Sequence, residues 1–370
     1  MYIFTFTLFA LFAYNDVFIK NKILFRLFGV LAVTWLIFHD GFRWGIGTDW
    51  DNYYNYFENI YNDNHEKLEI GYEVLTNIVR SFSENYSVFL VIHAVIVYSL
   101  ISKTVFRFSI NPFLSFLFLY SMMLTYLGMS RQYIAFAIIM YSYKYIIDKK
   151  FIFFILCISI AYLFHRSALL FIFAYFVNRQ WSQKFILISL ITVAIISISG
   201  IINLLPLNVF YLLNDDIGTK MTSYGDSNLI QANIFFTILS LLKRTFWIII
   251  VLFFRSKIKN EKGYFDFIFN LYFISTLIYI VFNNTILQVI VARGLLYYNI
   301  AEIFLIPYIL SLVKMDFLKK VAFLMLLIYG YLTINKAFEF YKKDLGVDIF
   351  RPYNSVLINS NYNAMNGHSK

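Results

Sequence analysis

The chain has 370 residues, of which 60% are hydrophobic and only 14% are charged, and its formal net charge at pH 7 is +10. Soluble globular proteins carry charge on about a quarter of their residues, so this composition excludes a soluble domain and indicates an integral membrane protein. The basic residues lie in short clusters between apolar runs, which argues against a nucleic-acid partner. The single cysteine, Cys157, lies within an apolar run, so we expect neither a disulfide framework nor a cysteine metal site.

Apolar runs recur along the whole chain. They predict an all-α fold, a polytopic transmembrane helix bundle of about 12 spans, each near the ~20 residues that cross a bilayer. The first run begins at Met1 without a basic leader or a small-residue cleavage site, so we expect a retained helix. No repeat or Gly/Ser-rich linker divides the chain, and we expect one integral-membrane domain over residues 1–370. The expected spans are residues 2–18, 22–38, 86–106, 110–127, 131–147, 151–164, 167–178, 185–203, 229–254, 264–283, 293–313 and 317–335.

Basic residues are unevenly distributed over the loops between these spans. One set of alternating loops holds 17 of the 31 Lys and Arg residues, against five Asp and Glu residues. The positive-inside rule makes this set cytoplasmic. Both termini and the segments 39–85, 204–228 and 336–370 are then expected on the periplasmic face of a bacterial inner membrane, where they would roof an outer cavity. These segments hold 15 of the 21 Asp and Glu residues, so the polar chemistry collects on that face.

The large outer segment 39–85 is rich in Tyr, Trp and Phe, which suit a membrane interface and also stack on sugar rings. Residues 68–82 predict an amphipathic helix that lies in the outer interface. The residues expected on its apolar face are Ile70, Val74, Leu75, Ile78 and Val79.

The densest polar motif is Gly-Phe-Arg-Trp-Gly-Ile-Gly-Thr-Asp-Trp-Asp-Asn-Tyr-Tyr at residues 41–54. Its glycines allow tight backbone turns just beyond a span. Arg43 is a candidate for a phosphate oxygen, and Asp49 for the proton of a sugar hydroxyl. In the alternative interpretation an Arg43–Asp49 pair only fixes a turn. The candidates for sugar contacts in this motif are Trp44, Asp51 and Tyr53.

Further basic residues stand where they are disfavoured. Arg131 begins a span from the outer side, as a ligand residue or as an interfacial anchor. His165 and Arg166 lie between two short spans, while Lys243 and Arg244 lie near the middle of one, where each charge costs at least ~2.5 kcal/mol. The arginines expected on the outer side are Arg43, Arg131, Arg166, Arg293 and Arg351. Because guanidinium geometry suits phosphate, this accumulation indicates a shared polyanionic ligand.

The order of these motifs resembles the EpsG family of bacterial membrane proteins over nearly the whole chain. The residues that carry the resemblance are Arg43, Gly47-Thr48-Asp49 and Tyr53, then Glu69-Ile70-Gly71-Tyr72, then Ser130-Arg131-Gln132, then His165-Arg166-Ser167, with Arg293 and Arg351-Pro352-Tyr353 following. The resemblance implies a Wzy-type polymerase of O-antigen, capsule or exopolysaccharide. Such an enzyme transfers a growing glycan from undecaprenyl pyrophosphate onto a lipid-linked repeat unit at the periplasmic face.

For this reaction the residues suggest a metal-free and cofactor-free site. Asp49 is the first candidate for the base that accepts the acceptor's proton, and His165 is the second. The candidates for pyrophosphate are Arg43, Arg131, Arg166, Arg244, Arg293 and Arg351. The expected partners are an undecaprenyl-pyrophosphate-linked oligosaccharide, membrane lipid, and a chain-length regulator and flippase of the same machinery.

Two other classes of protein stay open. A flippase or other transporter of lipid-linked oligosaccharide would also need a basic cavity, with internal repeats or charges deep in many spans. A non-catalytic assembly protein of the polysaccharide machinery would tolerate alanine at Asp49 and Arg131.

Overall fold

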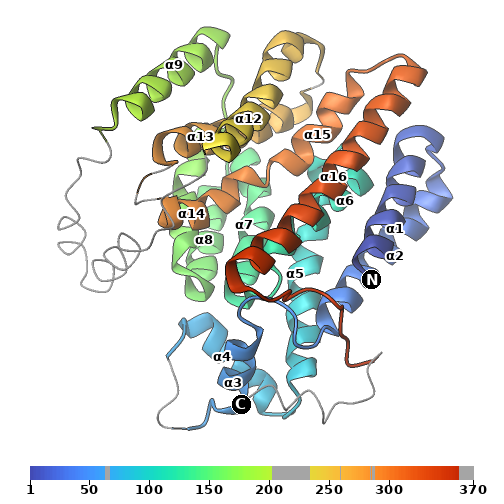
Figure 1. The fold of residues 1–370 in the computed structure, drawn as a ribbon, viewed down its shortest axis with the longest axis vertical. Helices are drawn as coiled ribbons and strands as arrows, with labels where there is room; N and C mark the ends of the chain where they lie inside the picture. Colours follow the sequence, from blue (N-terminus) through green and yellow to red (C-terminus); the bar gives the residue numbers. More distant parts are fainter. Residues whose placement is uncertain (63–66, 202–233, 259, 284, 286–287, 358–370) are drawn as a thin grey trace. The chain divides into compact units, whose positions relative to one another are not determined.

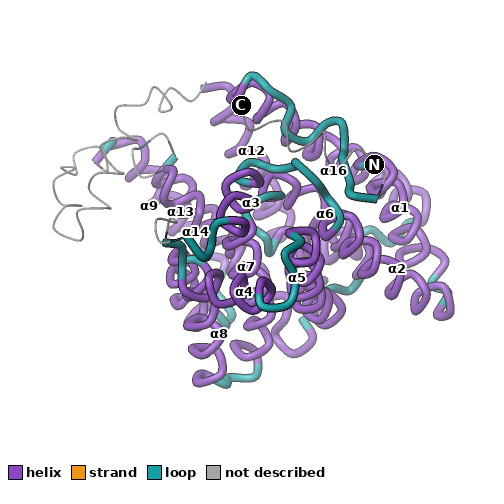
Figure 2. The backbone as a smooth tube through the Cα atoms, turned by 90° about the horizontal axis from the view of Figure 1, so that it is seen from below, coloured by secondary structure: helices purple, strands orange, loops and turns teal. Residues whose placement is uncertain are grey.

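The computed structural model describes residues 1–370 except 63–66, 202–233, 259, 284, 286–287 and 358–370. Over these described residues the fold is helical, as expected, with one isolated antiparallel bridge between Arg43 and Ser355 (Figure 2). The chain forms two compact units. The first contains Met1–Ile172 and Ile306–Lys370, and the second contains Phe173–Leu305.

In the first unit, α2 packs against α5, α7 against α5 and α8, and α6 against α1 and α16. Asparagine side chains begin two of these helices: Asn21 Oδ1 accepts from the backbone of Ile23, and Asn85 Oδ1 from that of Ser87. Figure 1 shows the short helices α3 and α4 together at one end of this unit. The elements are α1 (Tyr2–Tyr14), η1 (Asn15–Ile19), α2 (Lys22–Gly41), α3 (Trp50–Glu58), α4 (Ile70–Arg80), α5 (Tyr86–Phe108), α6 (Pro112–Met123), η2 (Leu124–Tyr126), α7 (Ser130–Ile147), α8 (Phe151–Phe164) and α16 (Asp316–Leu345).

The second unit is organised around α13, which packs against α9, α12 and α14. Asn270 of α13 donates to the carbonyls of Val177 and Arg179, 2.7 and 2.6 Å away, and so holds the segment that precedes α9. The described elements are α9 (Gln183–Ser199), α12 (Ile234–Phe254), η6 (Arg255–Lys257), η7 (Glu261–Gly263), α13 (Tyr264–Phe282) and α14 (Gln288–Asn299). The units are joined by η3 (Arg166–Val177) and by α15 (Glu302–Ser311).

Within the described residues, six helices are long and apolar enough to cross a membrane. They make the chain a multi-pass membrane protein, but the expected number of about 12 spans is not confirmed. Four other apolar helices are shorter: Pro112–Tyr126, Phe151–Phe164, Arg166–Val177 and Gln183–Ser199. The six are Tyr2–Ile19, Lys22–Gly41, Tyr86–Phe108, Tyr264–Phe282, Arg293–Ser311 and Asp316–Phe340.

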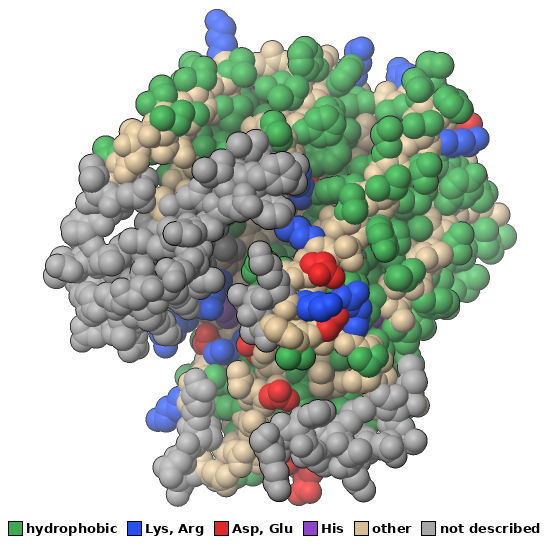
Figure 3. Space-filling model, in the orientation of Figure 1, with side chains coloured by type: hydrophobic (Ala, Val, Ile, Leu, Met, Phe, Trp, Pro, Cys, Tyr) green, Lys and Arg blue, Asp and Glu red, His purple; other side chains and the backbone are tan. Residues whose placement is uncertain are grey.

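The surface of α16 has the character of a lipid-facing helix. Only 17% of its apolar window is buried within the structure, and hydrophobic side chains cover much of its visible face (Figure 3). The helix continues to Leu345, so the first ten residues of the expected tail 336–370 are helical. The expected outer segment 204–228 lies outside the described residues.

The orientation expected from the positive-inside rule can be tested with the exposed residues Asn59 and Asn260. In a Cys157→Ala background, a cysteine at position 59 should react with an impermeant maleimide added to intact spheroplasts, and one at position 260 only after lysis. Labelling at 260 before lysis would reverse the orientation.

Candidate functional site

Two glycines bring the outer loop of the first unit against the start of α7. Gly47 and Gly128 have φ angles of +109° and +106°, in the left-handed region that favours glycine. A Cβ added to Gly47 would lie 2.7 Å from Cα of Gly128, and one added to Gly128 would lie 2.8 Å from Cα of Gly47. The two backbones therefore touch where side chains would keep them apart, and the loop before α3 is fixed to the turn before α7.

Three helices begin close to this contact. Asp49 is the N-cap of α3, Glu69 is the N-cap of α4, and Ser130 is the first residue of α7. Arg131, in the first turn of α7, forms an ion pair with Glu69. Its Nε donates to the hydroxyl of Tyr53, 3.0 Å away, and its guanidinium lies over the Tyr53 ring, 5.5 Å from the ring centre. We call Asp49, Tyr53, Glu69 and Arg131 the Arg131 cluster.

The Arg131 cluster is half open to its surroundings. The side chains of Arg131 and Glu69 are 28% and 16% exposed, and Nη2 of Arg131 makes no hydrogen bond to the described residues. Burial raises the pKa of Tyr53 above its ordinary value of 10.0; Arg131 acts to lower this pKa, and Asp49 adds to the rise. Tyr53 is therefore neutral and keeps its proton, so its hydroxyl accepts from Arg131 and can still donate.

Arg43 is not in this cluster. Its side chain is 1% exposed, and it forms an ion pair with Asp40, whose carbonyl also accepts from Nη1 of Arg43 at 2.8 Å. The alternative turn-fixing pair with Asp49 is thus replaced by a pair with the residue three positions earlier. A guanidinium buried in this way does not reach a ligand in the outer cavity.

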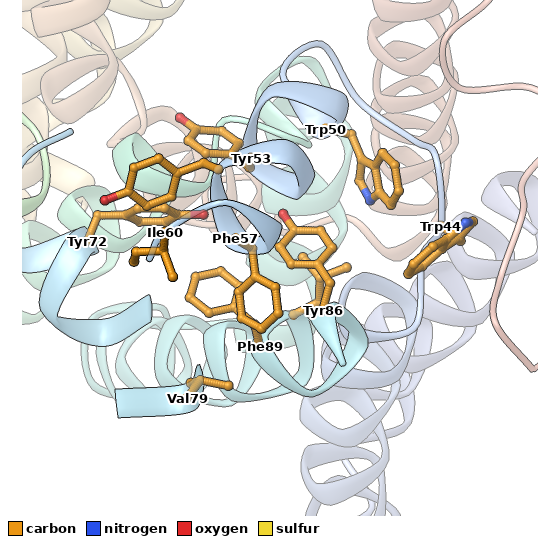
Figure 4. Close-up of a cluster of buried hydrophobic side chains, with 11 residues drawn as sticks. Trp44, Trp50, Tyr53, Phe57, Ile60, Tyr72, Val79, Tyr86 and Phe89 are labelled. Carbon is orange, nitrogen blue, oxygen red and sulfur yellow. The ribbon is translucent and has the colours of Figure 1, made fainter. Parts of the chain in front are cut away.

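Aromatic side chains of the outer segment pack on one another. Trp44 is 3% exposed, and its ring centre lies 4.8 Å from that of Trp50. Tyr53 packs against Tyr72, with ring centres 5.2 Å apart. Figure 4 shows these rings gathered with those of Tyr86, Phe57 and Phe89 between the short outer helices and α5. Trp44 and Tyr53 therefore have their faces covered by protein, whereas Asp51, also expected to contact sugar, is exposed.

The C-terminal segment 346–357 runs along the same loop. The backbone amides of Trp44 and Gly47 donate to the carbonyls of Asn354 and Ile349, at 3.1 and 3.3 Å. Between these two contacts lies Arg351, which is exposed; its Nε donates to Asp348 at 2.6 Å. The segment holds the loop from the side opposite to its neighbour in sequence, α2.

The other candidates lie elsewhere in the fold. His165 follows α8 and its Nδ1 is 2.7 Å from the hydroxyl of Ser167, while Arg166 is exposed. The end of α8 reaches α4, because Gly71 packs against Leu163. Arg244 and Arg293 belong to the second unit, where Nη1 of Arg244 donates to Asn299 at 2.9 Å and Arg293 is exposed.

Two residues of the site region were not expected to belong to it. Glu69 was part of the family resemblance, and its position before a predicted helix was the signal that could have marked it. His93 is fully buried in α5, and its Nε2 lies 3.0 Å from the carbonyl of Ser130, so it supports the start of α7. No sequence spacing relates residues 93 and 130. The described residues contain no group of three or more His, Cys, Asp or Glu that could hold a metal ion.

The contact between Gly47 and Gly128 predicts a large stability difference between two alanine variants. Gly45 also has a positive φ, +61°, but nothing lies within 4 Å of its would-be Cβ. Gly45→Ala should therefore cost only the ~1–2 kcal/mol of left-handed backbone. Gly128→Ala adds a collision with backbone and should lower the unfolding temperature of the detergent-purified protein much further. Equal unfolding temperatures would contradict the close contact.

Comparison with known proteins completes the picture of the chain. The EpsG family model matches residues 25–355. No curated protein and no solved structure matches the chain. The chain therefore belongs to the EpsG family, a membership that indicates a membrane protein of the polysaccharide-polymerase type.

Proposed function

We propose that this protein is a polysaccharide polymerase that acts at the periplasmic face of the inner membrane. It transfers a growing glycan from undecaprenyl pyrophosphate onto a lipid-linked repeat unit, as in the formation of O-antigen, capsule or exopolysaccharide. The observation that carries the proposal is the Arg131 cluster: a partly exposed guanidinium beside a half-buried carboxylate, Asp49, where three helices begin.

The Arg131 cluster suits a pyrophosphate leaving group. Helix N-termini carry a partial positive charge that favours anions, and Arg131 adds a full charge at the start of α7. Glu69 and Tyr53 fix the guanidinium from two sides, so Nη2 is held ready for a phosphate oxygen. Fixed donors of this kind stabilise the charge that develops as the bond to pyrophosphate breaks.

In the proposed step the acceptor hydroxyl attacks the anomeric carbon of the donor glycan. A new glycosidic bond forms, and the bond between that carbon and the pyrophosphate oxygen breaks. The leaving group, undecaprenyl pyrophosphate, keeps the electron pair. The proton of the acceptor hydroxyl goes to the carboxylate of Asp49, whose backbone carbonyl accepts from the amide of Tyr53 at 3.0 Å and fixes the start of α3.

Roles for the other candidates follow from their surroundings. Asp51 is exposed two residues beyond Asp49 and is proposed to bind a sugar hydroxyl. His165 remains the second candidate for the base. Arg166 and Arg351 are exposed cations of the first unit and are proposed as secondary contacts for the anionic substrate. Arg43, which is buried with Asp40, is left out of the proposed ligand set.

Asp49→Asn is nearly isosteric and should abolish polymer laddering in protein reconstituted with purified lipid-linked repeat units at saturating concentration. Loss of a general base costs roughly 10²–10⁴-fold in rate, whereas loss of a sugar contact weakens binding and is overcome by saturation. Asp51→Asn, the matched control in an exposed position, should ladder normally at saturation, and His165→Ala should keep measurable turnover.

Two results would contradict this assignment. If His165→Ala abolishes laddering and Asp49→Asn does not, His165 is the base and Asp49 only organises the loop. If both variants polymerise normally, this face of the protein is not catalytic.

Arg131→Lys keeps the positive charge but loses the planar fork that spans Tyr53, Glu69 and a phosphate. Because a hydrogen bond to a charged group contributes ~1.5–3 kcal/mol, we expect polymerisation to fall about 10- to 100-fold per folded molecule. The matched control is Arg107→Lys, which alters the Arg107–Asp148 pair (2.8 Å) on the face expected to be cytoplasmic. Equal activity of the two variants would make Arg131 an interfacial anchor only.

A further inference from the structure

The second unit contains a cluster of charged and aromatic side chains that the proposed reaction does not use. Lys243 and Arg244 lie near the middle of α12, nine and ten residues from its ends, or about 15 Å at 1.5 Å per residue. Every other residue of this helix is apolar or a hydroxyl residue. Cations at such a depth cost at least ~2.5 kcal/mol each on insertion scales, so their presence calls for a function.

The two cations meet the protein at a break in the neighbouring helix. The apolar segment Arg293–Ser311 was expected to be one continuous span, but it consists of α14, ending at Asn299, and α15, beginning at Glu302. Nζ of Lys243 lies 3.3 Å from Glu302, and Nη1 of Arg244 donates to Asn299 at 2.9 Å. One cation is therefore bound on each side of the break.

The charges of this cluster do not balance. Glu302 is 1% exposed and is shared between Lys243 and the indole of Trp247, which donates to it at 3.2 Å. Arg244 has only neutral partners: the amide of Asn299 and the ring of Tyr279, whose centre lies 4.2 Å from the guanidinium carbon. Among the described residues no carboxylate pairs with Arg244, so the cluster holds two cations and one anion.

The position of the pair allows a ligand to approach from the lipid. Leu242, Phe246, Ile249 and Phe253 form an exposed apolar stripe along α12, with exposed fractions from 50% to 78%. Lys243 and Arg244 lie at the border between this stripe and the packed face that contains Trp247, and the Lys243 side chain is 39% exposed.

We infer that Lys243 and Arg244 form an anion site that takes the phosphate group of a lipid, with Glu302 as a positioning residue that holds Lys243 at the break between α14 and α15. A phosphate supplies the missing negative charge, and guanidinium and ammonium groups together suit its oxygens. A lipid is favoured over free phosphate because the pair is flanked by apolar turns on both sides. The inference does not depend on the proposed polymerase reaction.

The test measures binding of farnesyl phosphate to the full-length protein in detergent micelles, with farnesol and inorganic phosphate as comparison ligands. Farnesyl phosphate should bind more tightly than either one. Arg244→Gln should weaken its binding about 10- to 100-fold, the range expected for one charge-assisted hydrogen bond. Lys257→Gln is the matched control, because it removes a cation just beyond the end of the same helix; it should leave binding unchanged.

Glu302→Gln separates an anion site from a merely structural ion pair. The amide can still accept from Trp247 but no longer neutralises Lys243, so farnesyl phosphate should bind more tightly to this variant than to the unmodified protein. Arg244→Lys, which keeps the charge, should bind more tightly than Arg244→Gln, and thermal unfolding checks that each variant is folded. Weaker binding in Glu302→Gln, or equal binding in Arg244→Gln and Lys257→Gln, would overturn the site. Inorganic phosphate binding as tightly as farnesyl phosphate would overturn the lipid as its ligand.

Discussion

The backbone contact between Gly47 and Gly128 is the constraint on which the outer face of the first unit depends. Two peptide chains approach this closely only where neither residue carries a Cβ, and both residues here also have a positive φ. The contact fixes where α3 and α7 begin relative to one another. Tyr53, one turn into α3, can then accept a hydrogen bond from Arg131, one residue into α7. The side-chain chemistry of the site is thus set by a contact between residues that have no side chains.

Buried charge holds the same loop from below. Asp40 and Arg43 are both about 1% exposed, and they join the end of α2 to the first residues of the loop. A buried ion pair contributes little net stability, because both charges lose their hydration. It does penalise any arrangement that separates the partners, since each would then be left buried and uncompensated. With the backbone bridge between Arg43 and Ser355, this pair gives the loop and the C-terminal segment 346–357 a defined register.

The sequence predicted features that depend on local patterns and missed those that depend on distant partners. Apolar runs predicted the helical membrane fold, and a cation at an outer helix start drew attention to Arg131. The partners of Arg131 lie 62 and 78 residues away, and no pattern relates them. Arg43 had a carboxylate at Asp40 and another at Asp49; only folding shows that Asp40, one helical turn back, is its partner. The number of spans could not be predicted either, because hydropathy does not reveal the break between Asn299 and Glu302.

Arg131 and Arg244 show how the surroundings of an arginine decide what it can bind. Each lies over a tyrosine ring, Tyr53 or Tyr279, and each donates to a side chain of another helix. Stacking and hydrogen bonding reduce the freedom of the guanidinium, so less entropy is lost when a ligand binds. The difference lies in the net charge around them. Glu69 neutralises Arg131, so an anion that binds there must gain from geometry and from the helix N-termini. Arg244 has neutral partners and retains its charge, so an anion at α12 would be attracted by the charge itself. The first arrangement suits a site where a substrate must bind, react and leave, and the second suits a site that retains a phosphate group.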